Sequence, residues 1–150
     1  MLKAQVALVS VFLCAAVSTR AVDRRCLREL PLQISQIWKS APVQRRTDGA
    51  LYTPTTENYT NCPGATLRCF AAEMKVLMKE WEITNVRLSL SNALNKTSRR
   101  FQQPDSDCLH CELLQEENGQ TFLERLTEVV QMMNSQFCKK AAPSKRRRRG

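Results

Sequence analysis

The strongest constraint on the fold is a run of apolar residues near the C-terminus that recurs with the period of an α-helix. The run consists of Phe122, Leu126, Val129, Val130, Met133 and Phe137. Its spacing predicts an amphipathic helix, and Thr121 with Glu124 forms an S/T-x-x-E capping box that predicts a start near Thr121. A helix with one apolar stripe must bury that stripe against other elements. The opposite face is polar and is expected to meet solvent: Glu124, Arg125, Glu128, Gln131 and Ser135.

The first 21 residues have the pattern of a signal peptide. Lys3 supplies the positive charge, residues 6–17 are an apolar segment of the appropriate length, and small residues follow at Ser18 and Ala21. Twelve apolar residues are too few to span a bilayer. We therefore expect a signal peptide over 1–21, a single folded domain over 22–138 and a basic tail over 139–150, with no membrane span and a secreted, extracellular protein.

The net charge of +9 does not indicate nucleic-acid binding, because the excess lies at the two ends of the chain. The leader holds two basic residues and the tail holds seven, which leaves 14 basic and 14 acidic residues between them. We expect no nucleic acid among the partners.

Six cysteines remain once Cys14 leaves with the leader: Cys26, Cys62, Cys69, Cys108, Cys111 and Cys138. An even number of cysteines in a small secreted chain predicts disulfides. Zinc is the alternative, because His110 lies between Cys108 and Cys111, but Cys62 and Cys69 lack a matching C-x-x-C spacing. A redox C-x-x-C is disfavoured because no βαβ pattern surrounds it. The sequence predicts no metal site and no cofactor.

Three further helices are expected ahead of the last one. Helical spacing covers residues 24–40, where Pro31 marks either a first turn or a kink, then 65–80 and, after a short join near Trp81, 82–95. Residues 41–61 and 96–107 are expected to be long loops, and a loop of twenty residues usually wraps the domain or binds something.

Four helices, two long connections and no substantial strand predict an all-α fold. Two long crossovers are typical of the up-up-down-down, short-chain cytokine bundle, here stapled by disulfides. In that topology the first and last helices bring Cys26 and Cys138 to the same end, and we expect them to be joined.

Several motifs resemble the interleukin-15 family, within the interleukin-2 group, over about residues 50–135. They are Ala50-Leu51-Tyr52-Thr53, Cys62 with Cys69-Phe70 and Glu73, Cys108-x-x-Cys111-Glu112, Phe122-Leu123, and Val129-Val130-Gln131-Met132. The signal is weak between residues 81 and 107. The resemblance implies disulfides Cys62–Cys108 and Cys69–Cys111; Cys26–Cys138 has no counterpart in the pattern and rests on topology.

The resemblance also implies partners, namely a private receptor alpha chain, a shared beta chain and a common gamma chain. The residues that match the alpha-chain face are Tyr52, Glu73, Val76, Glu80, Glu112 and Glu116. Four carboxylates around a small apolar centre would suit a basic receptor surface. The alternative is an ordinary solvated acidic face.

Gln131 matches the position on the last helix that faces the common gamma chain. For the beta chain, Glu29 fits the acidic position on the first helix only if the following loop holds a five-residue insertion. Asn85 and Arg87 are alternatives on the third helix, depending on register.

The expected function is that of a monomeric cytokine that bridges receptor chains and stimulates lymphocyte proliferation or survival. An interleukin-2-type growth factor is one alternative. A cationic antimicrobial or heparin-binding protein is the other, because sulfated glycans would suit Lys145, Arg146, Arg147, Arg148 and Arg149. With no catalytic set around the single histidine, His110, we expect no enzyme and no catalytic residues. N-glycosylation is expected at Asn58 and Asn95, in or beside the loops.

Overall fold

The structure, a computed structural model, describes residues 23–83, 89–102 and 107–139. The expected signal peptide and the tail from residue 140 onward lie outside the described residues. The elements are α2 (Leu30–Ser40), the 3₁₀ turn η1 (Val43–Arg45), β1 (Leu51–Tyr52), α3 (Thr56–Asn61), α4 (Pro63–Glu80), α5 (Ser89–Ser98), the 3₁₀ turn η3 (Cys111–Leu113), β2 (Glu116–Glu117) and α6 (Gly119–Phe137).

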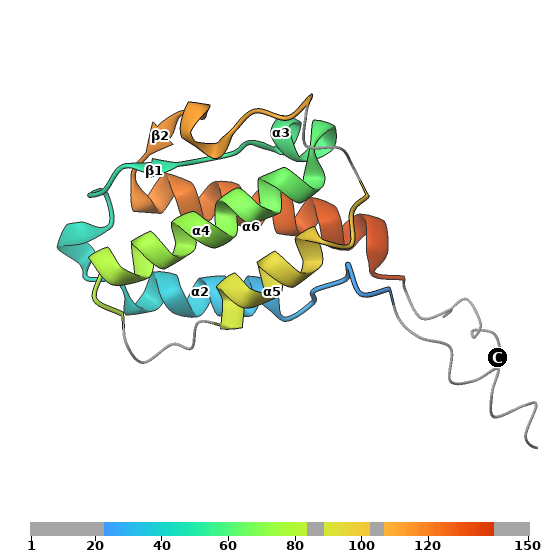
Figure 1. The fold of residues 1–150 in the computed structure, drawn as a ribbon. Helices are drawn as coiled ribbons and strands as arrows, with labels where there is room; N and C mark the ends of the chain where they lie inside the picture. The colour runs from blue at the N-terminus through green and yellow to red at the C-terminus, as the bar shows by residue number, and fades with distance from the viewer. Residues whose placement is uncertain (1–22, 84–88, 103–106, 140–150) are drawn as a thin grey trace, which may run out of the picture.

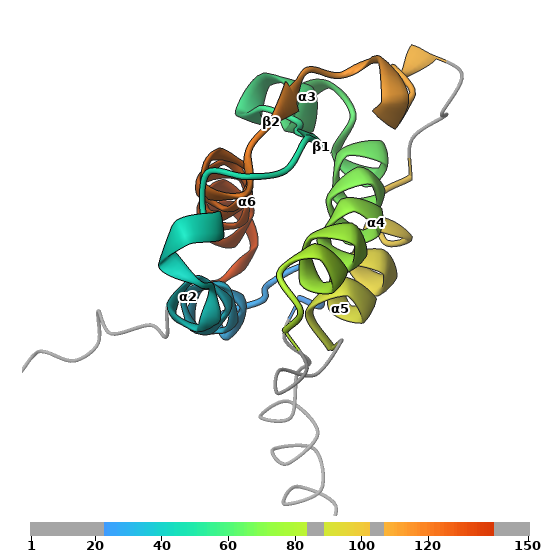
Figure 2. The ribbon, with the colours of Figure 1, turned by 90° about the vertical axis from the view of Figure 1, so that its left-hand side faces the viewer.

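Four of the helices form a bundle whose chain directions follow the expected order. The colours of Figure 1 show α2 and α4 running in one direction and α5 and α6 in the opposite one. Viewed from the end in Figure 2, α2 and α6 form one side of the bundle and α4 and α5 the other. The mostly helical, disulfide-bonded bundle confirms the predicted fold class.

The apolar stripe of α6 forms one wall of the core. Leu126, Val129, Val130 and Met133 are all fully buried. Phe122 meets Phe70 of α4 with ring centroids 5.4 Å apart. The stripe is therefore buried as its periodicity predicted, and the polar face opposite it remains exposed or half-exposed.

Helix α2 begins at Leu30 and carries Pro31 in its first turn, so the proline starts a helix and does not kink a longer one. Helix α4 ends at Glu80, and Glu82 has a φ of 55°, in the left-handed region. A helix cannot continue through that conformation, and the join expected near Trp81 is present.

The two crossover segments meet across the bundle as a small antiparallel ladder, in which Leu51 pairs with Glu117 and Tyr52 with Glu116. The first crossover also caps the last helix. The amide of Gly119 donates to the carbonyl of Asp48 at 3.1 Å. Backbone groups at a helix start need such partners.

Three details differ from the sequence prediction. Residues 56–61, expected in a loop, form α3, because Thr55 and Asn58 make a reciprocal capping box that needs no apolar period. Helix α5 extends to Ser98, beyond the expected end at residue 95, and Glu82 and Ile83, expected at its start, are not helical. Helix α6 begins at Gly119, since the side chain of Asn118 accepts from the Thr121 amide and takes the capping role expected of Thr121.

Three disulfides fasten this arrangement. They join Cys26 to Cys138, Cys62 to Cys108, and Cys69 to Cys111, the pairs that the sequence analysis expected. The last two tie the second crossover to the first turns of α4.

Candidate binding surfaces

The ladder between β1 and β2 lies against α4 and places side chains from three segments on one surface. The Tyr52 amide donates to Oε1 of Glu73 at 2.8 Å. Glu116 is the ladder partner of Tyr52, and Glu112 lies in η3, one residue after the disulfide-bonded Cys111. Backbone pairing and a disulfide therefore hold this surface in a fixed arrangement.

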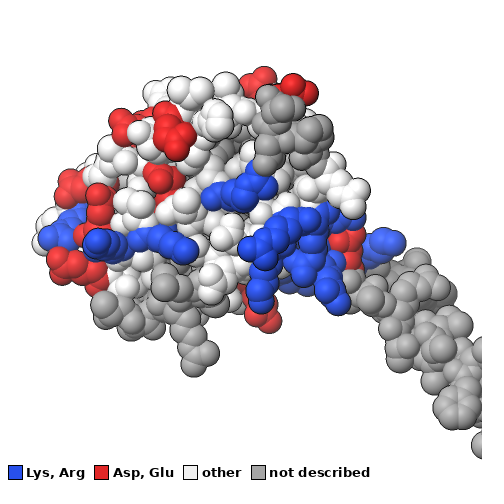
Figure 3. Space-filling view, viewed as in Figure 1, with Lys and Arg blue, Asp and Glu red and all other residues white. Residues whose placement is uncertain are grey.

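Glu73 is the half-buried centre of this surface. Burial raises the pKa of the Glu73 carboxyl above its usual range, the Tyr52 amide opposes that rise, and the negative charges of Glu112, Glu116 and Glu80 add to it. The four carboxylates therefore lie close enough to repel one another, and Figure 3 shows carboxylates gathered over β2 and the adjoining part of α4.

Val76 lies between Glu73 and Glu80 on α4 and is 40% exposed. The structure thus brings all six residues expected to face the alpha chain onto one surface, which we name the acidic face: Tyr52, Glu73, Val76, Glu80, Glu112 and Glu116. Their role in binding stays a prediction.

Two large apolar residues near the acidic face were not singled out from the sequence. Leu109 is 61% exposed and Leu113 is 68% exposed. The disulfides at Cys108 and Cys111 hold this short segment against α4 and leave both leucines outside the core. Their position within and beside the C-x-x-C motif could have indicated this exposure. A chain fixed at two cysteines so close together cannot bury every neighbouring side chain in the core.

A second surface is a groove of about 510 Å³ between α2 and α6. Its lining is Pro31, Ile34, Ser35, Trp38, Gln120, Leu123, Glu124, Thr127 and Glu128. The periodicity of each helix was readable from the sequence, but the groove depends on how the two helices pack.

Gln131 lies on α6 one residue beyond the buried Val130, and its side chain is exposed. No hydrogen-bond partner meets that side chain among the described residues. Asn134, three residues later, is by contrast engaged with the backbone of Leu27. The side chain of Gln131 can therefore bind an external partner without breaking a hydrogen bond to the described residues.

Of the three residues expected to face the beta chain, the structure describes Glu29 alone. Glu29 is the exposed residue immediately before α2, and its side chain makes no capping hydrogen bond. Asn85 and Arg87 lie outside the described residues.

Both expected glycosylation sites lie on helices and not in loops. Asn58 is in α3, and its Oδ1 accepts from the Thr55 amide at 2.8 Å, which leaves the amide nitrogen for a glycan. Asn95 is on α5 and is half-buried. Asn58 was expected in a loop because α3 lacks a clear apolar period, whereas Asn95 was expected at the end of a helix, beside a loop, and lies on α5.

No helix among the described residues is both long enough and apolar enough to cross a membrane. Within the same residues, no cluster of three or more histidine, cysteine, aspartate or glutamate side chains is arranged to hold a metal ion.

Comparison with known proteins agrees with the resemblance that the motifs carry. The family model described as Interleukin 15 matches residues 9–135. Interleukin-15 of Oryctolagus cuniculus is 28% identical over 89 residues, which cover 57% of this chain and 54% of that protein. The match thus spans about half the length of that relative, and no solved structure matches significantly. Because the family model covers most of the sequence, the chain belongs to the interleukin-15 family.

Proposed function

We propose that this chain is a secreted cytokine that bridges a private receptor alpha chain, a shared beta chain and a common gamma chain, and so stimulates lymphocytes through kinase-coupled receptors. The chain belongs to a cytokine family, which is not an enzyme class. The observation that carries the proposal is the acidic face, where residues from β1, β2, η3 and α4 converge.

The acidic face suits a basic surface on the alpha chain. Burial is the main cause of the raised pKa of Glu73, and repulsion from Glu112, Glu116 and Glu80 adds to it. A cationic partner would relieve that repulsion on binding, and the same charges would accelerate encounter. Val76, and Leu113 beside Glu112, add exposed apolar area that such a partner would bury.

The exposed stretch of α6 around Gln131, together with the groove between α2 and α6, suits the common gamma chain. The side chain of Gln131 makes no hydrogen bond within the described part of the chain that binding would have to break. We place the beta chain near Glu29, with Asn85 or Arg87 on the following helix as the other contacts.

The test is Gln131→Asp. A charge placed at the centre of a desolvated interface and left unpaired costs about 2 kcal/mol or more in binding, whereas an exposed substitution changes folding stability by about 0.5 kcal/mol or less. The variant should melt like the wild type and still bind the alpha chain, yet fail to induce receptor-dependent phosphorylation in responding cells.

Gln36→Asp is the matched control, because it makes the same substitution at an exposed position of α2 that does not line the groove. The control should signal normally. Full signalling by a well-folded Gln131→Asp protein would falsify the assignment of α6 to the gamma chain.

The alternative functions make different predictions. An interleukin-2-type factor would bind a different alpha chain, so binding to single recombinant receptor chains separates the two. A cationic antimicrobial or heparin-binding protein would lose its activity when residues 139–150 are deleted, whereas a receptor-bridging cytokine would retain it. Sulfated glycans bound by the tail would be a secondary partner of the cytokine.

A further inference from the structure

A basic surface lies at the end of the bundle where the two termini of the described chain meet. Three segments form it: residues 23–28, 96–101 and 136–139. We name this surface the basic end. These segments carry Arg24, Arg25, Arg28, Lys96, Arg99, Arg100 and Lys139, and a single carboxylate, Asp23.

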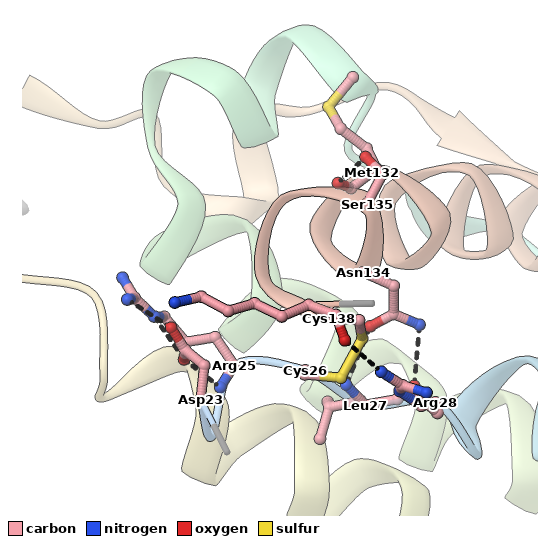
Figure 4. Close-up of a disulfide and its surroundings, with 10 residues drawn as sticks. Asp23, Arg25, Cys26, Leu27, Arg28, Met132, Asn134, Ser135 and Cys138 are labelled. Atoms are coloured by element: carbon pink, nitrogen blue, oxygen red, sulfur yellow. Dashed lines mark hydrogen bonds and ion pairs between the residues drawn. A yellow bond between two sulfur atoms is a disulfide. The ribbon is translucent and has the colours of Figure 1, made fainter. Parts of the chain in front are cut away.

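Cross-links hold the three segments together. The Cys26–Cys138 disulfide joins the first to the last. The Arg28 side chain donates to the carbonyl of Lys139 at 2.9 Å, and Figure 4 shows this part of the chain around the disulfide. The guanidinium of Arg25 lies 4.0 Å from the ring centroid of Phe137 and 5.6 Å from that of Phe101. The positive charges are therefore displayed on a fixed scaffold.

The one carboxylate of these segments is already neutralised. Asp23 accepts two side-chain hydrogen bonds from Arg25, at 3.1 and 2.9 Å, and Arg25 lowers the pKa of the Asp23 carboxyl. The remaining cations have no such compensation within the three segments. Five of them are exposed: Arg24, Arg28, Lys96, Arg99 and Lys139.

The largest group of cations and the acidic face lie in different places. Figure 3 shows Lys and Arg side chains gathered over the C-terminal end of α5, while carboxylates gather over β2 and the adjoining part of α4. A polyanion attracted to the basic end would meet little repulsion there and would leave the acidic face open.

We propose that the basic end is a folded binding site for a sulfated glycosaminoglycan, distinct from the basic tail and independent of the alpha-chain and gamma-chain assignments. Three disulfides indicate an oxidising, extracellular setting, where sulfated glycans are the abundant polyanions. A single-stranded nucleic acid is a poorer fit, because such strands bind by stacking on exposed aromatic rings. The rings present, Phe101 and Phe137, are partly buried against the core and covered by Arg25.

The proposal predicts that a cell-surface glycan retains the protein with its acidic face free. The alpha chain and the glycan would then bind the same molecule at once.

The test compares two triple variants of the full chain with equal charge change. Arg24→Gln/Lys96→Gln/Arg99→Gln removes three exposed charges from the basic end. Lys39→Gln/Lys75→Gln/Lys79→Gln removes three exposed charges from α2 and α4. At physiological salt, the basic-end variant should bind heparin about tenfold more weakly than the control variant. It should also elute from a heparin column at lower salt, because a protein that makes fewer cationic contacts releases fewer counterions when it binds.

Equal elution of the two triple variants would overturn the proposal, because the binding would then follow net charge or the tail alone. De-sulfated heparin should bind weakly to the wild type and to both triple variants. If a DNA oligonucleotide binds as tightly as heparin and suffers the same loss, the site is not a glycan site. Alpha-chain binding by the basic-end variant should be unchanged, which separates this result from failure of the receptor proposal.

Discussion

The side chain of Asn134 and the backbone of Leu27 form a reciprocal pair of hydrogen bonds across 107 residues of sequence. The Leu27 amide donates to Oδ1 at 2.9 Å, and Nδ2 donates to the Leu27 carbonyl at 2.9 Å. The amide side chain of Asn134 therefore satisfies backbone groups in the segment that leads into α2. It fixes that segment to α6 beside the Cys26–Cys138 disulfide.

Asn134→Leu should lower the free energy of unfolding by about 1–3 kcal/mol, because it leaves the partly buried amide of Leu27 without a partner and leaves the Leu27 carbonyl with the Leu30 amide alone, at 3.2 Å. Gln131→Leu is the control, since that side chain is exposed and makes no internal hydrogen bond. Denaturant unfolding measures both. Equal stability of the two variants would show that the pair contributes nothing. Asn134→Asp retains the acceptor but not the donor, so its free energy of unfolding should lie between those of the wild type and Asn134→Leu.

Gly119→Ala should destabilise the protein by about 1–3 kcal/mol through overpacking. A Cβ at this position would lie 2.3 Å from an atom of the Trp81 ring, so this residue, which is only 3% exposed, would have to shift within the core. Gly64→Ala is the comparison, because its closest contact would be 3.1 Å, to the carbonyl of Ser98. The melting temperature of Gly119→Ala should be lower than that of Gly64→Ala, and the reverse order would contradict the close packing of Gly119 against Trp81.

Glu73→Gln should make the protein slightly more stable at pH 7, by less than about 1 kcal/mol. The amide oxygen still accepts from Tyr52, while the repulsion from Glu80, Glu112 and Glu116 is removed.

The sign of the pH dependence follows from the raised pKa of Glu73. The folded state holds this proton more tightly than the unfolded state, so the stability that protonation contributes is present below the unfolded pKa and is lost as pH rises through the folded one. The advantage of Glu73→Gln should therefore shrink as pH falls from 7 toward 4. Urea unfolding of both proteins across that range tests it, and a constant difference would contradict the carboxylate cluster.

The bundle was predictable because its helices are long and amphipathic. The stripe from Phe122 to Met133 repeats often enough to fix both the helix and its buried face. The start of α6 was misplaced, because Asn118 and Thr121 both precede the apolar run and both are residues that cap helices. Helix α3 was missed because a single buried residue, Tyr59, gives no period.

The acidic face was predictable only through the resemblance. Tyr52, Glu73 and Glu116 are far apart in sequence, and no periodicity links them. Their juxtaposition depends on the β1–β2 ladder, whose strands are two residues long and leave no alternating pattern. The basic end was missed for a similar reason, since residues 23–28 and 96–101 meet only through tertiary packing.

The bond between Cys26 and Cys138 turns nearly all of the folded chain into a covalent ring, from which both termini leave at one place. A protease that cuts any single peptide bond inside the ring opens it but releases no fragment. The nicked molecule would keep its mass apart from one added water, and the two pieces would come apart only after reduction. If the protein is secreted, as we propose, its resistance to extracellular proteases then depends on a second cut more than on the first.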